Sequence, residues 1–84
     1  MTYSVEILRT AQKQLSKINR QDQDRIISTV EALSDNPRPA GCKKLSGRPA
    51  WRIRIGTYRV IYEVQDDKLI VLIVHVGHRK EVYR

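Results

Sequence analysis

Apolar and polar residues alternate along residues 51–62, WRIRIGTYRVIY, on both sides of a Gly56-Thr57 pair. A period of two predicts β-strands, and a pair that begins with glycine suits the tight turn of a hairpin. A loop of two or of four residues gives the same register, with Trp51 opposite Tyr62 and Arg54 opposite Arg59. We therefore predict that the rest of the chain is organised around this hairpin.

The two faces of the predicted hairpin differ in chemistry. One face is apolar and carries Trp51, Ile53, Ile55, Val60 and Tyr62. The other carries Arg52, Arg54 and Arg59, and like charges directly opposed across two strands destabilise a sheet by up to about 1 kcal/mol. A polyanion supplies the missing countercharge, so the pattern indicates a phosphate-binding face. Two solvated arginines on an exposed sheet explain this pattern equally well when it is taken by itself.

The N-terminal part of the chain predicts one strand and two helices. Residues 2–8 alternate as a strand, and Thr10 is placed to cap a first helix. The Asn19-Arg20 break is short, so a second helix is expected to fold back beside the first. That second helix ends before Pro37, because proline disfavours helix in the residue before it. We find no chemistry in these elements and interpret them as scaffold.

After the hairpin, Asp66-Asp67 predicts a turn into a last strand over residues 68–76. This strand is apolar on both faces, so it is expected inside the sheet. A two-residue turn puts Tyr62 opposite Val71 and His75 on the core side, where we interpret His75 as structural. The arginine face then also carries an apolar strip of Ile61, Ile70, Leu72 and Val74. This strip needs a cover, and we hypothesise that a partner protein lies over it when the protein is inactive.

Two basic segments flank the hairpin. The Pro/Gly-rich loop of residues 38–50 can act as a phosphate-gripping edge or as an ordinary connection. Its candidate binding residues are Lys43, Lys44 and Arg48. The tail after the last strand extends the basic face with His78, Arg79, Lys80, Tyr83 and Arg84. We predict that both segments belong to the same polyanion-binding surface.

Composition sets the broad class of the protein. The 84 residues are expected to form one small domain, residues 1–84, and they carry a net charge of +7 and a single cysteine. Residues 1–37 have no net charge, so residues 38–84 hold the whole excess. This asymmetry is typical of nucleic-acid-binding proteins, with a merely soluble basic protein as the alternative. The lone cysteine fits a reducing cytosol, and the sequence predicts neither a membrane span nor a signal peptide.

The sequence contains no Ser/His/Asp set, paired carboxylates, phosphate-binding loop or metal-ligand spacing, so we expect neither a metal nor a cofactor. What it contains is arginine clustered with aromatic hydroxyls. Guanidinium groups bind phosphate bidentately and stabilise the charge that develops when a phosphodiester is cleaved. Arginine stays protonated, so the candidates for proton transfer are His78, Lys80, Tyr83 and Glu63. A nucleic-acid-binding module uses the same residue types, so these residues do not separate binding from cutting.

The motifs KLSG, WRIRIGTYRVIY, an acidic turn, an apolar strand and VGHRKEVY follow one another in this chain. In this order they make the chain resemble the RelE family of toxins over essentially its whole length. The resemblance implies an α+β fold of order β-α-α-β-β-β, with a small antiparallel-type sheet and two N-terminal helices packed on one face. It also implies a cytoplasmic toxin of a type II toxin-antitoxin system, neutralised in a hetero-oligomer with an acidic, RelB-like antitoxin. The implied activity is metal-independent, ribosome-dependent cleavage of messenger RNA in the A site.

The resemblance further implies roles for individual residues. Arg59 would bind the scissile phosphate, Arg79 would act near the leaving oxygen, and Tyr83 would stack on or orient a base. Arg52 and Arg54 would complete the phosphate site. Wider contacts with RNA and the ribosome would come from Lys43, Lys44, Arg48, His78 and Lys80. The ribose 2′-hydroxyl would attack the adjacent phosphate, and the apolar strip would bind the antitoxin.

Two departures from the family pattern matter. Relatives carry lysine at the positions of Arg52 and Arg54, and arginine is a poor general base, so we expect electrostatic and positional catalysis to dominate. We also expect no C-terminal helix of the kind that some relatives have, because the chain stops one residue after Tyr83. Two alternatives stay open. One is a ParE-like toxin that poisons DNA gyrase on the same fold, and the other is a non-catalytic RNA-binding module.

Overall fold

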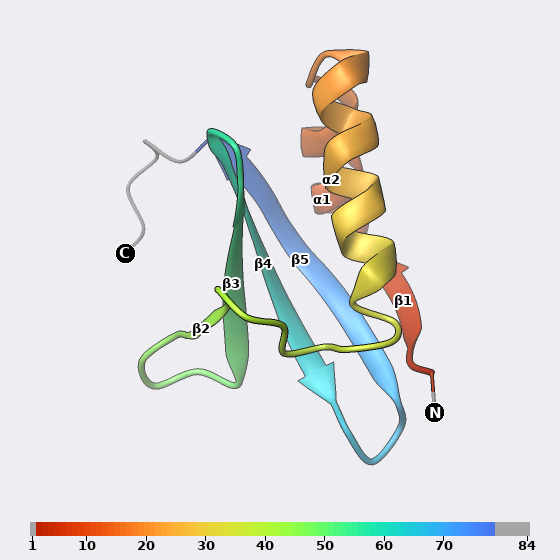
Figure 1. Ribbon diagram of the computed structural model, residues 1–84, viewed down its shortest axis with the longest axis vertical. Coiled ribbons are helices and arrows are strands. Elements are labelled where there is room, and N and C mark those ends of the chain that lie inside the picture. Colours follow the sequence, from red (N-terminus) through yellow and green to blue (C-terminus); the bar gives the residue numbers. More distant parts are fainter. Residues whose placement is uncertain (1, 79–84) are drawn as a thin grey trace.

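The computed structural model describes residues 2–78, which form two helices and a five-stranded sheet (Figure 1). In chain order the elements are β1 (Ser4–Ile7), α1 (Arg9–Ser16), α2 (Arg20–Ala32), β2 (Lys43–Lys44), β3 (Ala50–Ile55), β4 (Tyr58–Gln65) and β5 (Ile70–His78). The strand order is β1-β5-β4-β3-β2, and β1 runs parallel to β5 while the other pairs are antiparallel. The predicted α+β class is confirmed, with the short strand β2 added. Neither helix in this part of the chain has the length and apolarity that crossing a membrane requires.

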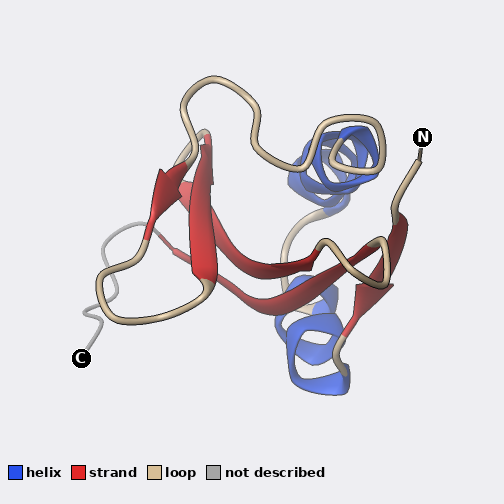
Figure 2. Cartoon of the chain, turned by 90° about the horizontal axis from the view of Figure 1, so that it is seen from below, coloured by secondary structure: helices blue, strands red, loops and turns tan. Residues whose placement is uncertain are grey.

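The two helices and one face of the sheet share a core. Figure 2 shows α2 on the concave side of the twisted sheet, and α1 packs against β5. The core consists of Ala11, Ile26, Val30, Leu33, Ile53, Ile55, Val60, Tyr62, Val71, Ile73 and Val76. Burial of this apolar surface is the main favourable term that holds the layers together. The side chains on the opposite face of β3 and β4 do not belong to this core.

The break between the helices is fixed by a reciprocal cap. The Oδ1 atom of Asn19 accepts from the backbone N–H of Asp22 at 2.9 Å, and its Nδ2 atom donates to the Asp22 carboxylate at 2.8 Å. This confirms the predicted break, and the first bond satisfies one of the N–H groups that a helix start leaves without partners. The predicted cap of the first helix is wrong, because α1 begins at Arg9 and Thr10 lies inside its first turn. Leu8 occupies the N-cap position without a side-chain hydrogen bond.

The central hairpin has the register that its sequence predicts. Trp51 pairs with Tyr62 and Arg54 pairs with Arg59 across β3 and β4. A two-residue turn closes the hairpin, and Gly56 takes a φ of 60° at its first position. Residues with a Cβ rarely adopt this conformation, so the glycine is what allows so short a turn.

The predicted register between the last two strands is wrong. Tyr62 lies opposite Ile73 rather than Val71, because the β4–β5 loop has four residues and not two. A β-bulge between Ile61 and Tyr62 then shifts the pairing again, so that Ile61 lies opposite His75. An extra residue in one strand reverses which side chains face the core. Val76, which is 3% exposed, therefore takes the core position that the sequence assigned to His75.

The outer edge of β1 is covered at both ends. The N–H of Tyr3 donates to the carbonyl of Ser34 at 2.8 Å, and the Ser34 hydroxyl donates back to the Tyr3 carbonyl at 2.8 Å. At the other end, Nε2 of Gln12 donates to the carbonyl of Ile7 at 2.8 Å. These bonds tie β1 to the end of α2 and to the start of α1.

Candidate functional site

Four basic side chains lie on the sheet face that points away from the core. Lys43 on β2 is opposite Arg52 on β3, and Arg54 on β3 is opposite Arg59 on β4. Successive residues of a strand point to opposite faces, so these four share one face while Ile53 points into the core. We refer to Lys43, Arg52, Arg54 and Arg59 as the basic face.

Arg54 and Arg59 form the centre of the basic face. Their direct opposition, which the sequence predicts, is confirmed. Arg54 is exposed and Arg59 is half-buried, and within residues 2–78 Arg54 makes no salt bridge with a carboxylate. On β5, the residue opposite Arg59 is Gly77, so the neighbouring strand adds no side chain there. The pair therefore concentrates positive charge at one place on the sheet face.

The strand β2 separates the two lysines that the sequence grouped together. It pairs Lys43 with Arg52 and Lys44 with Trp51, so the two lysines point to opposite faces. Lys43 joins the basic face. The ammonium group of Lys44 donates to the carbonyl of Arg48 at 3.1 Å and so closes the following loop. The structure thus brings one of the three loop residues that we predicted to bind phosphate beside the arginines.

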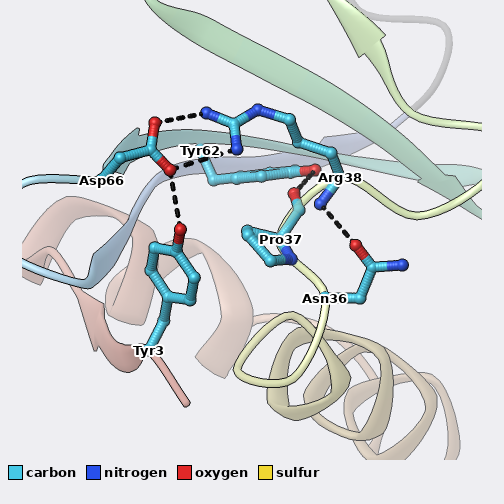
Figure 3. Close-up of polar contacts among 6 residues, drawn as sticks. All are labelled: Tyr3, Asn36, Pro37, Arg38, Tyr62 and Asp66. Atoms are coloured by element: carbon cyan, nitrogen blue, oxygen red, sulfur yellow. Dashed lines mark hydrogen bonds and ion pairs between the residues drawn. The ribbon is translucent and has the colours of Figure 1, made fainter. Parts of the chain in front are cut away.

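A polar cluster fastens the loop that leads into β2, as Figure 3 shows. Arg38 forms a bidentate ion pair with Asp66, with N–O distances of 2.7 and 3.2 Å. The hydroxyl of Tyr3 donates to the same carboxylate at 2.7 Å. The Arg38 guanidinium also lies 5.1 Å from the ring centroid of Trp51, within cation–π range. Because Trp51 neighbours Lys44 across the strands, this cluster helps to hold β2 in register.

The titration of this cluster follows from its hydrogen bonds. The bond from Arg38, and then the bond from Tyr3, lower the pKa of Asp66 below its ordinary value. The bond to Asp66 raises the pKa of Tyr3, and burial adds to this effect. The carboxylate is thus held ionised and the phenol neutral, which is the combination that this hydrogen-bonding pattern needs.

A second anchor of the same loop is buried. The hydroxyl of Tyr62, whose side chain is 0% exposed, donates to the carbonyl of Pro37 at 2.7 Å (Figure 3). Burial, and then the neighbouring Cys42 thiol, raise the pKa of Tyr62 far above that of a free phenol. The tyrosine therefore stays neutral and continues to donate at any ordinary pH.

The predicted contribution of the C-terminal tail can be followed only as far as His78. This residue pairs with Tyr58 at the end of β5, and the two rings meet edge to face with centroids 5.5 Å apart. The side chain is exposed and comes directly after Gly77, the partner of Arg59. The other predicted tail residues, Arg79, Lys80 and Tyr83, lie outside the described residues.

The predicted apolar strip needs a correction. Ile61 is 3% exposed, so it is already buried and cannot be part of an open strip. Ile70, Leu72 and Val74 are half-buried on β5. Leu72 pairs with Glu63 on one side and Glu6 on the other, so carboxylates flank the strip. The sheet face is therefore divided into a basic part near the hairpin turn and an apolar and acidic part near β1.

The basic face suits phosphate binding and electrostatic stabilisation. Guanidinium groups grip phosphate oxygens in a fixed fork geometry, and a fixed positive charge stabilises negative charge that develops during a reaction. None of its four side chains is a plausible proton acceptor at neutral pH. Within residues 2–78 no cluster of three or more histidines, cysteines or carboxylates is arranged to hold a metal ion.

Sequence reasoning missed the contact that joins α1 to β5. The Oε1 atom of Gln14 accepts from the backbone N–H of Val76 at 2.8 Å, and its Nε2 atom lies 3.1 Å from Nδ1 of His75. The first bond fixes the orientation of the amide, so its nitrogen is the atom that faces the imidazole. The only available signal was a glutamine on the inner side of a predicted amphipathic helix.

The fold and the site together define a small α+β protein with a polyanion-binding sheet face. A family model described as "ParE toxin of type II toxin-antitoxin system, parDE" matches residues 5–83, and the chain belongs to this family. It is therefore a toxin of the RelE/ParE superfamily of type II toxin-antitoxin systems.

Individual relatives agree with this assignment. Toxin RelG of Mycobacterium tuberculosis is 33% identical over 92 aligned positions, which cover 100% of this chain and 99% of RelG. The mRNA interferase toxin RelE of Escherichia coli is 28% identical, with 99% of this chain and 92% of that protein covered. A chain from the crystal structure of the archaeal RelE–RelB complex of Pyrococcus horikoshii OT3 superposes with a TM-score of 0.86. It is 28% identical, and the match covers 98% of this chain and 100% of that one.

Proposed function

We propose that this protein is a ribosome-dependent endoribonuclease that cleaves messenger RNA in the A site and so inhibits translation in the cytoplasm. The observation that carries the proposal is the opposed pair of Arg54 and Arg59, with Arg52 and Lys43 beside it on one face. Such a cluster matches the charge of a phosphodiester backbone. A relative that covers nearly the whole chain is named an mRNA interferase, which supports RNA as the substrate.

In the proposed reaction the ribose 2′-hydroxyl attacks the adjacent phosphorus. A bond from the 2′-oxygen to phosphorus forms, the bond to the 5′-oxygen breaks, and negative charge grows on the phosphoryl oxygens. Arg59, half-buried and opposite Gly77, binds the scissile phosphate, and Arg54 stabilises the growing charge. Arg52 and Lys43 hold a neighbouring phosphate. A site of this kind accelerates the reaction by position and electrostatics.

Proton transfer is assigned to other groups, because an arginine does not accept the proton of the 2′-hydroxyl. In this proposal Arg79 acts near the leaving oxygen and Tyr83 stacks on or orients a base. His78, directly after Gly77 and exposed at the end of β5, is the described residue best placed to exchange a proton at this site. A His78→Gln variant should slow the cleavage step and leave RNA binding little changed if this assignment is right.

Primer extension on a translated message after induction of the toxin tests the proposal. Wild-type protein should give cuts at fixed codon positions, Arg59→Ala should abolish them, and Arg54→Ala should reduce them strongly. Lys68→Ala is the matched control, since it removes one exposed positive charge from the β4–β5 loop. Equal melting temperatures would show that all the variants fold. A wild-type protein that makes no codon-position cuts would overturn the proposal.

Poisoning of DNA gyrase is a second candidate function, because the matching family model is that of ParE toxins. This activity needs no scissile-phosphate site, so it gives the opposed arginines no specific role. A supercoiling assay with purified protein distinguishes the two. Inhibition that persists in Arg59→Ala favours the gyrase function, whereas uninhibited gyrase together with messenger RNA cleavage favours the endoribonuclease.

We also propose that a cognate antitoxin neutralises the protein in a hetero-oligomer. A similar chain is part of the archaeal RelE–RelB complex of Pyrococcus horikoshii OT3, which supports a partner of this kind. The half-buried Ile70, Leu72 and Val74 offer it an apolar contact surface on β5. Coexpression with an acidic protein from the neighbouring reading frame should give a stable complex. Leu72→Asp should weaken that complex while leaving ribosome-dependent cleavage unchanged.

A further inference from the structure

A second run of positive charge lies outside the basic face. Residues 7–21 contain no carboxylate, and their basic side chains are Arg9, Lys13, Lys17 and Arg20. A spacing of four puts the first three on one side of a helix, over about 12 Å of its axis. Like charges at this spacing destabilise a helix by a few tenths of a kcal/mol. The helix dipole favours a cation at Lys13, in the last turn, but opposes one at Arg9, in the first turn, so helix stability does not explain the whole row.

The structure places Arg9 and Lys13 on the outer side of α1, and Lys17 is the C-cap residue that follows the helix. We refer to Arg9, Lys13 and Lys17 as the α1 stripe. All three are exposed, and the inner side of the same helix buries Ala11. The polar side chains of Gln12 and Ser16 line a shallow depression together with Arg9 and Lys13. Within residues 2–78 none of the stripe residues makes a salt bridge.

The α1 stripe is close to the basic face. Gln14, on the inner side of α1, accepts a hydrogen bond from the backbone of Val76 on β5. The next residue, Gly77, pairs with Arg59. A single strand therefore separates the helix from the centre of the basic face, because α1 packs against β5, which pairs with β4. In Figure 1, α1 lies partly behind α2. A large polyanion on the basic face is thus within reach of the stripe.

The chemistry of the stripe favours nucleic acid over protein as its partner. The core of a protein–protein interface is apolar and depleted in charged residues, whereas nucleic-acid interfaces are polar and strongly positive. The outer positions of α1 hold arginine, lysine, glutamine and serine and no apolar side chain. We propose that the α1 stripe binds the phosphate backbone of structured RNA. Given the proposed function, this is ribosomal RNA beside the substrate strand.

The test compares two double variants of the full-length protein with equal charge. Lys13→Gln/Lys17→Gln removes two charges from the stripe, and Lys44→Gln/Lys68→Gln removes two exposed charges elsewhere. Lys44 is a suitable control because it pairs with Trp51 and so points away from the basic face. Both variants also carry Arg59→Ala to prevent cleavage. Affinity for bacterial ribosomes, and for a short RNA duplex, is measured over a series of salt concentrations.

The stripe variant should bind both probes more weakly than the control variant. The slope of log affinity against log salt should fall by about two, because each lost phosphate contact removes roughly one unit. Equal slopes for the two double variants would overturn the inference. Weaker binding to ribosomes with unchanged binding to the duplex would also overturn it, because the contact would then be with ribosomal protein. These measurements do not require cleavage, so the inference and the proposed enzymatic function fail separately.

Discussion

Arg38 and Asp66 form a bidentate ion pair although 28 residues separate them in the sequence. Tyr3 adds a hydrogen bond to the same carboxylate, and Arg38 stacks on Trp51. Four distant segments therefore meet at one exposed cluster, and one of them is the loop that delivers β2 to the sheet. Exposed ion pairs by themselves contribute little to stability, so the role of the cluster is chiefly to position the loop.

The cluster predicts a specific dependence of stability on pH. A carboxyl whose pKa is lowered in the folded protein stabilises the fold above its unfolded pKa of about 3.9. That stabilisation is lost as the pH falls through the lowered folded value. Wild-type protein should therefore lose stability below about pH 4 more steeply than Asp66→Asn. Thermal unfolding measured from neutral to acidic pH checks this, and parallel curves would contradict it.

The same cluster acts in the opposite direction at high pH. The pKa of Tyr3 is raised, so its contribution to stability is present below about pH 10, its ordinary value, and is lost as the pH rises through the raised one. Tyr3→Phe should remove this alkaline loss and leave the acidic one in place. Asp66→Asn and Tyr3→Phe therefore test the acceptor and the donor of the same hydrogen bond separately.

The buried bond from Tyr62 to Pro37 predicts a larger effect on stability. Tyr62→Phe leaves the Pro37 carbonyl without its donor in a site closed to water, which costs about 1–3 kcal/mol. Tyr58→Phe is the matched control, since Tyr58 is only half-buried and keeps its ring contact with His78. Urea denaturation gives both values. Equal losses of unfolding free energy in the two variants would contradict a specific stabilising role of the bond to Pro37.

The contact between α1 and β5 gives a further prediction. Gln14→Ala removes the acceptor of the Val76 N–H and the partner of His75, and should lower the free energy of unfolding by about 1–3 kcal/mol. Gln12→Ala removes only an exposed bond to Ile7, so its effect should stay within about 0.5 kcal/mol. Chemical denaturation of the pair measures the difference. A Gln14→Ala protein as stable as Gln12→Ala would contradict the prediction.

Two adjacent lysines test the basic face itself. Lys43→Gln should weaken RNA binding and lower the salt slope by about one, because this side chain shares a face with Arg52. Lys44→Gln, with the same change of charge one residue later, should leave the slope nearly unchanged, because Lys44 points to the other face. Equal losses in the two variants would mean that the loop, and not the sheet face, binds the RNA.

The sequence predicts those parts of the fold that local chemistry determines. The hairpin register follows from Gly56, since a two-residue turn and strict alternation leave one arrangement for Arg54 and Arg59. The helix break follows from Asn19, whose side chain caps the next helix whatever else packs around it. For the hairpin register and the helix break, the local sequence was sufficient to predict the structure.

The remaining parts depend on contacts that are distant in sequence. β5 is apolar on both faces, so its pattern does not reveal the bulge that moves His75 off the core side. β2 has only two residues in a Pro/Gly-rich loop, and the loop that leads into it is held by an ion pair between Arg38 and the distant Asp66. Consequently the sheet positions of Arg52, Arg54 and Arg59 were predicted, whereas the opposite orientations of Lys43 and Lys44 and the burial of Ile61 were not.

The hydrogen bonds that cover the edge of β1 also affect the self-association of this protein. An exposed edge strand is a template on which another chain can add a strand, and runaway addition leads to aggregation. Ser34 and Gln12 occupy the edge groups of Tyr3 and Ile7, which leaves an intruding strand little backbone between them to pair with. These bonds therefore make strand addition from another copy unfavourable at this edge of the sheet.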